Sequence, residues 1–255
     1  MIRIIRQVSL GLALLMAMSF VSADNKKVTV YLIGDSTMSV KEEKAYPETG
    51  WGMPFAHFFD ASVTIDNRAK NGRSTKSFLS ENLWQPVATQ LKPGDYVLMQ
   101  FGHNDAAKDK PERYTPPEEY KMNLKKFISE ARSKKAIPVV LSAVTRRKFG
   151  KEGKVEETHP IYAALAKAVA EEEKAAFIDL NERSKTLLEQ FGEEHSKWLY
   201  LQLEPGKNPN YPEGINDNTH FSEMGAREVA QIVLQELKTL NLDLTQHIYK
   251  PAPKK

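Results

Sequence analysis

Cysteine is absent from the 255 residues of the sequence. The chain therefore has no disulfide framework, no thiol nucleophile and no thiolate ligand for a metal ion. A His-Glu-x-x-His pattern and a histidine-rich tract are also missing, so the sequence indicates no zinc site. Internal repeats and low-complexity linkers are absent as well, which predicts one domain that depends on its hydrophobic core for stability.

The N-terminal segment has the pattern of a secretory signal peptide. "MIRIIRQ" supplies two arginines, residues 8–21 are an apolar run, and small residues lead up to Ala23. A membrane anchor is the alternative, but these 14 apolar residues fall short of the roughly 20 that span hydrocarbon. We expect residues 1–23 to be removed and residues 24–255 to form one exported domain, periplasmic or secreted, without membrane attachment.

After removal of residues 1–23, neither positive nor negative charge would dominate the chain. The formal net charge of +3 includes Arg3 and Arg6, so cleavage would leave +1. Basic residues are spread among acidic ones, without a basic arm or basic residues interleaved with aromatic ones. The sequence therefore predicts no nucleic-acid partner.

Apolar runs alternate with helical patterns along the chain. Five short runs rich in β-branched residues read as strands, and four amphipathic stretches between and after them read as helices. Strands that alternate with helices predict an α/β domain with a parallel sheet covered on both faces. The predicted strands are 27–33, 62–66, 96–101, 137–143 and 176–180, and the predicted helices are 74–91 (bent or divided at Pro86), 117–135, 159–175 (with Thr158 as a cap) and 222–240.

Polar motifs follow the ends of the predicted strands, where ligands bind in parallel sheets. "GDST" with Ser36 follows the first strand, at a turn expected to lead into a helix. Serine is a common helix N-cap, so Ser36 is either a cap or a nucleophile. "DNTH" near the C-terminus places Asp217 three residues before His220, a spacing that lets the carboxylate reach Nδ1 while Nε2 faces a serine. Alone, this pair could equally cap the last helix.

Two further residues supply the hydrogen-bond donors that a developing oxyanion requires. Gly72, after the second strand, has no side chain to block its N–H, and Asn104, after the third, carries an amide. Each is also a common turn residue. Their joint placement with Ser36 at one edge of the sheet favours acyl-transfer chemistry.

These blocks resemble the SGNH (GDSL) hydrolase superfamily across nearly the whole chain after residue 23. The resemblance implies that Ser36, His220 and Asp217 form the catalytic triad and that Ser36, Gly72 and Asn104 form the oxyanion hole. It also implies a flavodoxin-like three-layer α/β/α sandwich with a five-stranded parallel sheet, and no cofactor.

"GDST", "NGRSTKSF", "QFGHND" and "SAVTRR" are similar to the rhamnogalacturonan acetylesterase branch. This likeness implies an enzyme that deacetylates a pectin polysaccharide or its oligosaccharides, and we expect the protein to be a monomer. Acetylxylan or another glycan is an alternative substrate. A lipase or thioesterase would require an apolar acyl groove, whereas the loops here are polar and charged. A non-catalytic glycan-binding relative would be expected to lack a triad residue.

A pectin backbone carries galacturonate carboxylates, so a site for it should offer cations. Arg73 follows the oxyanion glycine, and Arg146 and Arg147 follow the fourth strand. Arginine suits bidentate carboxylate recognition, although each could be a solvated loop charge. His103, beside Asn104, is expected to line the site, to orient Asn104, or to be purely structural.

The remaining candidates receive structural interpretations. Ser74 is a rival serine, but it should start the helix that follows it. Neither Ser74 nor Ser36 lies in a G-x-S-x-G elbow, which argues against an α/β-hydrolase. His57 should pack in an apolar helix, and His159 should lie on the surface.

Overall fold

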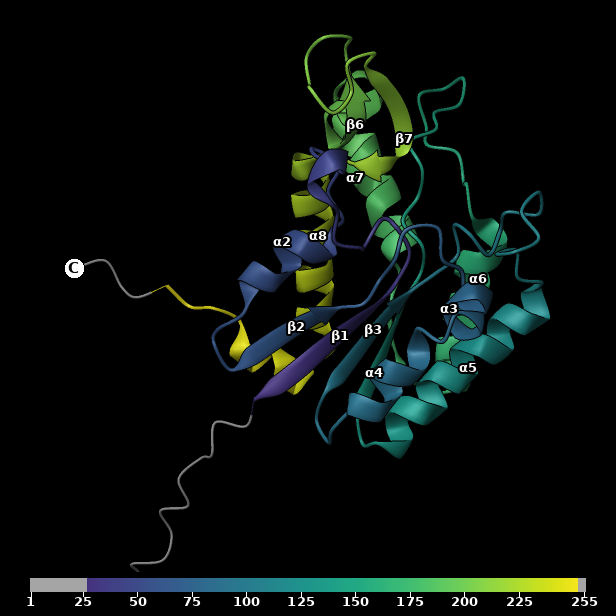
Figure 1. Ribbon diagram of the computed structural model, residues 1–255, viewed down its shortest axis with the longest axis vertical. Helices are drawn as coiled ribbons and strands as arrows, with labels where there is room; N and C mark the ends of the chain where they lie inside the picture. Colours follow the sequence, from purple (N-terminus) through teal and green to yellow (C-terminus); the bar gives the residue numbers. More distant parts are fainter. Residues whose placement is uncertain (1–26, 252–255) are drawn as a thin grey trace, which may run out of the picture.

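The computed structural model describes residues 27–251, so the predicted signal peptide lies outside the described residues. The main sheet has five strands, all parallel, in the order β2-β1-β3-β4-β5 (Figure 1). Its strands are β1 (Val28–Gly34), β2 (Val63–Asn67), β3 (Tyr96–Gln100), β4 (Ile137–Leu141) and β5 (Ala176–Ile178). The predicted parallel α/β sheet is confirmed. That residues 24–255 form a single domain stays a prediction.

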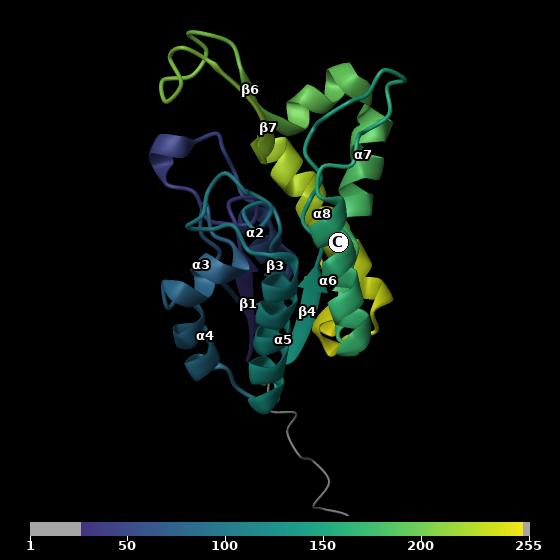
Figure 2. The same ribbon diagram turned by 90° about the vertical axis from the view of Figure 1, so that its right-hand side faces the viewer.

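Helices cover both faces of this sheet and complete a three-layer sandwich (Figures 1 and 2). Successive strand residues point to opposite faces. Leu32 therefore packs in one core cluster, and its neighbour Ile33 packs in the other. The first face carries α2 (Gly52–Phe55), α7 (Leu180–His195) and α8 (Glu223–Thr239), and the second carries α3 (Thr75–Ser80), α4 (Trp84–Gln90), α5 (Pro117–Ser133) and α6 (Pro160–Glu172).

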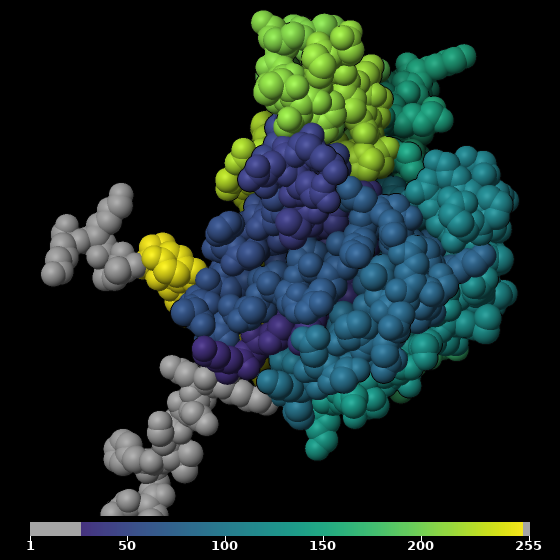
Figure 3. Space-filling model, in the orientation of Figure 1, coloured from purple at the N-terminus to yellow at the C-terminus, as the bar shows by residue number. Residues whose placement is uncertain are grey.

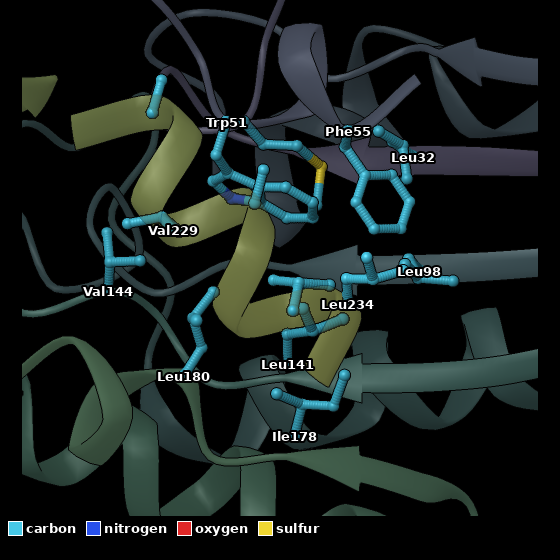
Figure 4. Packing of buried hydrophobic residues seen from close by; sticks show 14 of the residues in the cluster. Leu32, Trp51, Phe55, Leu98, Leu141, Val144, Ile178, Leu180, Val229 and Leu234 are labelled. Carbon is cyan, nitrogen blue, oxygen red and sulfur yellow. The ribbon is translucent and has the colours of Figure 1, made fainter. Parts of the chain in front are cut away.

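The larger core cluster lies between the sheet and α8 (Figure 4). Leu98 from the sheet and Val229 from α8 belong to this cluster, as do the fully buried rings of Trp51 and Phe55. The Trp51 indole also donates to Gln100 Oε1 at 2.7 Å, so its one polar atom is satisfied. Burying each large apolar side chain contributes about 1.5–3 kcal/mol. This core packs against β1 and the neighbouring strands, and the loops that form the site follow the C-terminal ends of these strands.

Local sequence explains most helix boundaries. The predicted helix 74–91 is divided, because Asn82 adopts a positive φ of 56° between α3 and α4. Pro86 lies in the first turn of α4, where its missing N–H costs nothing. Ser74 caps α3 in a reciprocal capping box, as predicted. The predicted Thr158 cap is wrong: His159 is the N-cap of α6, and its side chain makes no capping bond.

A two-stranded antiparallel sheet was not predicted. Its strands, β6 (Tyr200–Leu203) and β7 (Ile215–Phe221), project beyond the C-terminal ends of the main strands (Figures 1 and 3). The short 3-10 helices are η1 (Glu43–Ala45), η2 (Ala56–Phe58), η3 (Ser196–Leu199) and η4 (Asp243–His247). Across residues 27–251, no helix combines the length and apolarity needed to cross a membrane.

Candidate active site

Six of the predicted site residues line one cavity of about 330 Å³ above the ends of the main strands, namely Ser36, Gly72, His103, Asn104, Arg146 and His220. Ser36 comes from the loop after β1, Gly72 from the loop after β2, and Asn104 from the loop after β3. His220 reaches the same cavity from β7. The expectation that these loops share one edge is correct, since all five main strands run parallel.

Ser36, His220 and Asp217 form a continuous hydrogen-bonded chain. The Ser36 hydroxyl lies 2.8 Å from His220 Nε2, and His220 Nδ1 lies 2.6 Å from Asp217 Oδ2. Burial alone would raise the pKa of Asp217, but hydrogen bonds from the His220 ring and from backbone N–H groups lower it to about 2. Asp217 is therefore an ionised acceptor. Nδ1 must carry the proton, which leaves Nε2 to accept from the serine hydroxyl.

Ser36 does not cap a helix. It lies in a turn in which the Met38 and Ser39 N–H groups donate to the Asp35 carbonyl, at 3.3 and 3.1 Å. The expected helix after β1 is absent there; 3-10 helix η1 begins only at Glu43. The turn directs the hydroxyl toward His220. Asp217 and His220 belong to a strand rather than to a turn. Asp217 Oδ1 nevertheless accepts from the backbone N–H of His220 at 2.9 Å, which keeps the carboxylate close to the His220 ring as predicted.

A buried lysine ties the Ser36 turn to the loop that follows β2. Lys41 Nζ donates to the Ser36 carbonyl and, at 2.8 Å, to Asn71 Oδ1 beside Gly72. Burial lowers the pKa of Lys41, and an ion pair with Glu48 at 2.7 Å opposes that shift. Sequence reasoning missed this lysine, because no local signal separates it from the many surface lysines.

Three hydrogen-bond donors face the cavity near Ser36. Among the hydrogen bonds of residues 27–251, neither the Ser36 N–H nor the Gly72 N–H has a protein acceptor. Gly72 has a φ of +75°, and a Cβ there would lie 3.2 Å from Arg113 Nη1, so glycine suits the position. The Asn104 amide gives one N–H to the Arg73 carbonyl at 3.0 Å and has a second N–H to offer.

Two histidines that do not belong to the triad lie near it: His103 lines the cavity, and His159 packs against His103. Buried Asp35 is 3.0 Å from His103 Nδ1, and although burial would raise the pKa of Asp35, the His103 ring lowers it. His159 packs edge-on against His103 at 4.3 Å. Burial, followed by the nearby His103 and Arg146, lowers the pKa of His159 to about 2. The predicted surface position of His159 is wrong, and so is the predicted packing of His57, which is exposed.

Of the three predicted substrate arginines, Arg146 lines the cavity. Arg73 instead forms two bonds with Glu81, at 2.9 and 2.7 Å. Arg147 donates to Asn218 and Ser196 and lies over a phenylalanine ring. Neither of these two side chains lines the cavity.

Two other cations, Lys110 and Arg113, line the cavity and were missed. Their signal was the basic stretch "KDKPER" in the long loop after "GHND". Within residues 27–251, no group of three or more histidine, aspartate or glutamate side chains could hold a metal ion.

Comparison with known proteins gives consistent matches. Residues 32–228 match the model of the GDSL-like lipase/acylhydrolase family. The chain is 42% identical over 223 residues to the rhamnogalacturonan acetylesterase RhgT of Bacillus subtilis, a match that covers 88% of this chain and 95% of that protein. The "Probable rhamnogalacturonan acetylesterase YesY" of the same bacterium is 37% identical over 222 residues, covering 87% and 97%. The solved structure of B. subtilis YxiM gives a TM-score of 0.73 at 27% identity, covering 85% of this chain and 58% of that one.

Proposed function

The chain belongs to the GDSL-like lipase/acylhydrolase family, and from this membership we propose that it removes acetyl groups from the rhamnogalacturonan of pectin. The family match confirms the resemblance predicted from the sequence. Full-length relatives named rhamnogalacturonan acetylesterases support the substrate. The hydrogen-bonded chain from Ser36 through His220 to Asp217 is the observation that carries the chemistry.

The proposed reaction has two halves. Ser36 Oγ attacks the acetyl carbonyl while His220 Nε2 takes its proton, and the Ser36 and Gly72 N–H groups and the Asn104 amide stabilise the oxyanion. The bond to the sugar oxygen then breaks, and His220 returns the proton to that oxygen. In the second half His220 takes a proton from water, the hydroxide attacks acetyl-Ser36, and acetate leaves as Ser36 regains its proton.

The cavity favours a small acyl group on a polar substrate. Its lining includes Glu48, Asn71, Lys110, Arg113 and Arg146, which offer no apolar groove for a long acyl chain. This lining disfavours a lipase or thioesterase. A non-catalytic glycan-binding role is disfavoured too, since every member of the proposed triad is present and in contact.

Asn104→Ala is expected to lower kcat by about 10²- to 10³-fold with little change in KM. The variant loses one donor of the proposed oxyanion hole, and the stabilisation it provides is realised only when charge develops on the carbonyl oxygen. Kinetics on a small acetyl ester measure the split between kcat and KM. Asn210→Ala, at an exposed asparagine outside this cavity, is the matched control. An Asn104→Ala enzyme with full kcat would show that Asn104 is only a turn residue.

The substrate proposal is tested by acetate release. The two polysaccharides are compared at equal concentrations of acetyl ester. Acetylated rhamnogalacturonan is expected to give a kcat/KM about tenfold or more above that of acetylated xylan, because specificity depends on the contacts between the enzyme and the sugar that carries the acetyl group. A preference for xylan would reject the pectin substrate and leave the esterase chemistry standing.

The proposed function also includes that the protein is exported and that it is a monomer. Export rests on the signal-peptide pattern of residues 1–23, and an N-terminus at Asp24 in the mature protein would support it. Gel filtration measures the oligomeric state directly.

A further inference from the structure

We propose that a second cavity beside the triad is a subsite for a carboxylate of the polysaccharide, held by Lys110, Arg113 and Arg146. The inference rests on the proposed function, because it concerns the acidic sugars of that substrate. Of the cations predicted from the sequence it keeps Arg146, and it adds Lys110 and Arg113, which line the same cavities.

The second cavity, of about 390 Å³, adjoins the first. The two have five lining residues in common, namely His103, Asn104, Lys110, Arg113 and Arg146. Ser36 and His220 line only the first cavity, whereas Thr158 and His159 line only the second. A sugar whose acetyl group meets Ser36 would therefore place a neighbouring substituent or sugar in the second cavity, next to the shared cations.

These cations lack fixed counter-ions. Among the residues that the structure describes, no carboxylate lies within 4.0 Å of the Lys110 or Arg146 nitrogens. Arg113 has only the exposed Glu112, at 3.8 Å. By contrast, Arg73 is paired with Glu81 at 2.7 Å and does not line either cavity.

Two carboxylates line the cavities, but they are outnumbered by the three cations and form no ion pair with them. Asp109, in the second cavity, is exposed and makes no ion pair within the described part of the chain. Glu48, in the first, is paired with buried Lys41 at 2.7 Å. The excess of positive charge at the shared wall therefore remains available to an anionic substrate.

The arginines are held in place by neutral partners. Arg146 donates to Thr219 Oγ1 at 3.0 Å and to His159 Nε2 at 3.4 Å. A neutral His159 can accept that bond, which agrees with its lowered pKa. Arg113 Nη1 donates to Asn104 Oδ1 at 3.1 Å, which leaves other guanidinium N–H groups for a carboxylate.

Two buried polar atoms at this wall have no hydrogen-bond partner within residues 27–251. They are Arg113 Nε and His103 Nε2. Buried polar groups are nearly always hydrogen-bonded, so unpaired ones point to a missing ligand or water. His103 is 6% exposed, and its other ring nitrogen is already engaged by Asp35. Both residues line the wall that the two cavities share, which is where the sugar would bind.

The test compares one acetylated rhamnogalacturonan oligosaccharide with its methyl-esterified form, in which the carboxylates are neutral. We expect the wild-type kcat/KM for acetate release to be about tenfold or more higher on the acidic form. Lys110→Gln and Arg146→Gln should each lower the ratio of the two values by about 3- to 10-fold, because each removes one charge-assisted contact. Lys108→Gln is the matched control: this lysine lies in the same loop, is exposed, and lines neither cavity. It should keep the wild-type ratio.

The outcomes separate the two proposals. Equal rates of the wild type on both forms, or an unchanged ratio in both variants, would reject the carboxylate subsite while the esterase function stood. A wild-type enzyme that hydrolysed small acetyl esters but released no acetate from either oligosaccharide would reject the pectin function and the subsite together. A falling ratio in Lys108→Gln as well would show only a general effect of surface charge.

Discussion

Ser36→Ala is expected to lower kcat/KM for acetyl esters by about 10⁴-fold or more while leaving the fold intact. The substitution removes the hydroxyl that His220 activates from 2.8 Å. No described hydrogen bond of the core depends on that hydroxyl, so circular dichroism and the unfolding midpoint should match the wild type. Rates of acetate release measure the loss, and a serine-directed organophosphate should label Ser36 in the wild type.

Ser74→Ala is the matched control, because the two serines should show opposite effects. Ser74 is fully buried and caps α3. Its loss should reduce the free energy of unfolding by about 1 kcal/mol and leave kcat unchanged. Organophosphate labelling at Ser74, or a Ser36→Ala enzyme that retained activity, would overturn the assignment of the nucleophile.

Asp217→Asn is expected to lower kcat by about 10⁴-fold. An amide that presents its NH₂ to the ring favours the tautomer with the proton on Nε2, and that tautomer cannot accept the proton of Ser36. Asp217 is ionised down to about pH 2, whereas the amide that replaces it cannot ionise, so raising the pH should not restore the required tautomer in the variant. Asp243→Asn, at an exposed aspartate, should behave as the wild type.

The lowered pKa of Asp217 also makes the stability of the fold depend on pH. The folded protein binds the Asp217 proton less readily than the unfolded chain, whose value is near the ordinary 3.8. Its stabilising contribution is therefore present above about pH 4 and is lost as the pH falls toward about 2. The free energy of unfolding should fall more steeply over that interval in the wild type than in Asp217→Asn. Parallel curves would show that Asp217 gains nothing from its hydrogen bonds.

The main sheet could be predicted because its signals are local. Each of its strands is a short run of apolar and β-branched residues, and parallel pairing follows from the intervening helices. Once that sheet is assumed, Ser36, Gly72 and Asn104 must lie on one edge. The sequence therefore led to the proposed nucleophile and to two proposed oxyanion donors without knowledge of any distance.

What the sequence did not reveal depends on contacts between distant segments. β7 contains Asn216, Asp217 and Asn218, residues disfavoured in strands, and it exists because β6 pairs with it. Burial of Lys41 and of His159 likewise results from partners elsewhere in the chain. Helix α7 was not predicted, although aspartate is a common N-cap and the Asp179 side chain accepts from the Glu182 N–H at its start.

The contact between Ser36 and His220 joins residues 184 positions apart. A ribosome makes Ser36, the proposed nucleophile, early and makes His220, its proposed base, near the end of the chain, on the small β6–β7 sheet. A nascent or truncated chain thus carries a serine that has no partner to activate it. Hydrolysis then becomes a reporter of completed folding: during renaturation, esterase activity cannot return before the C-terminal segment docks, however early the main sheet forms.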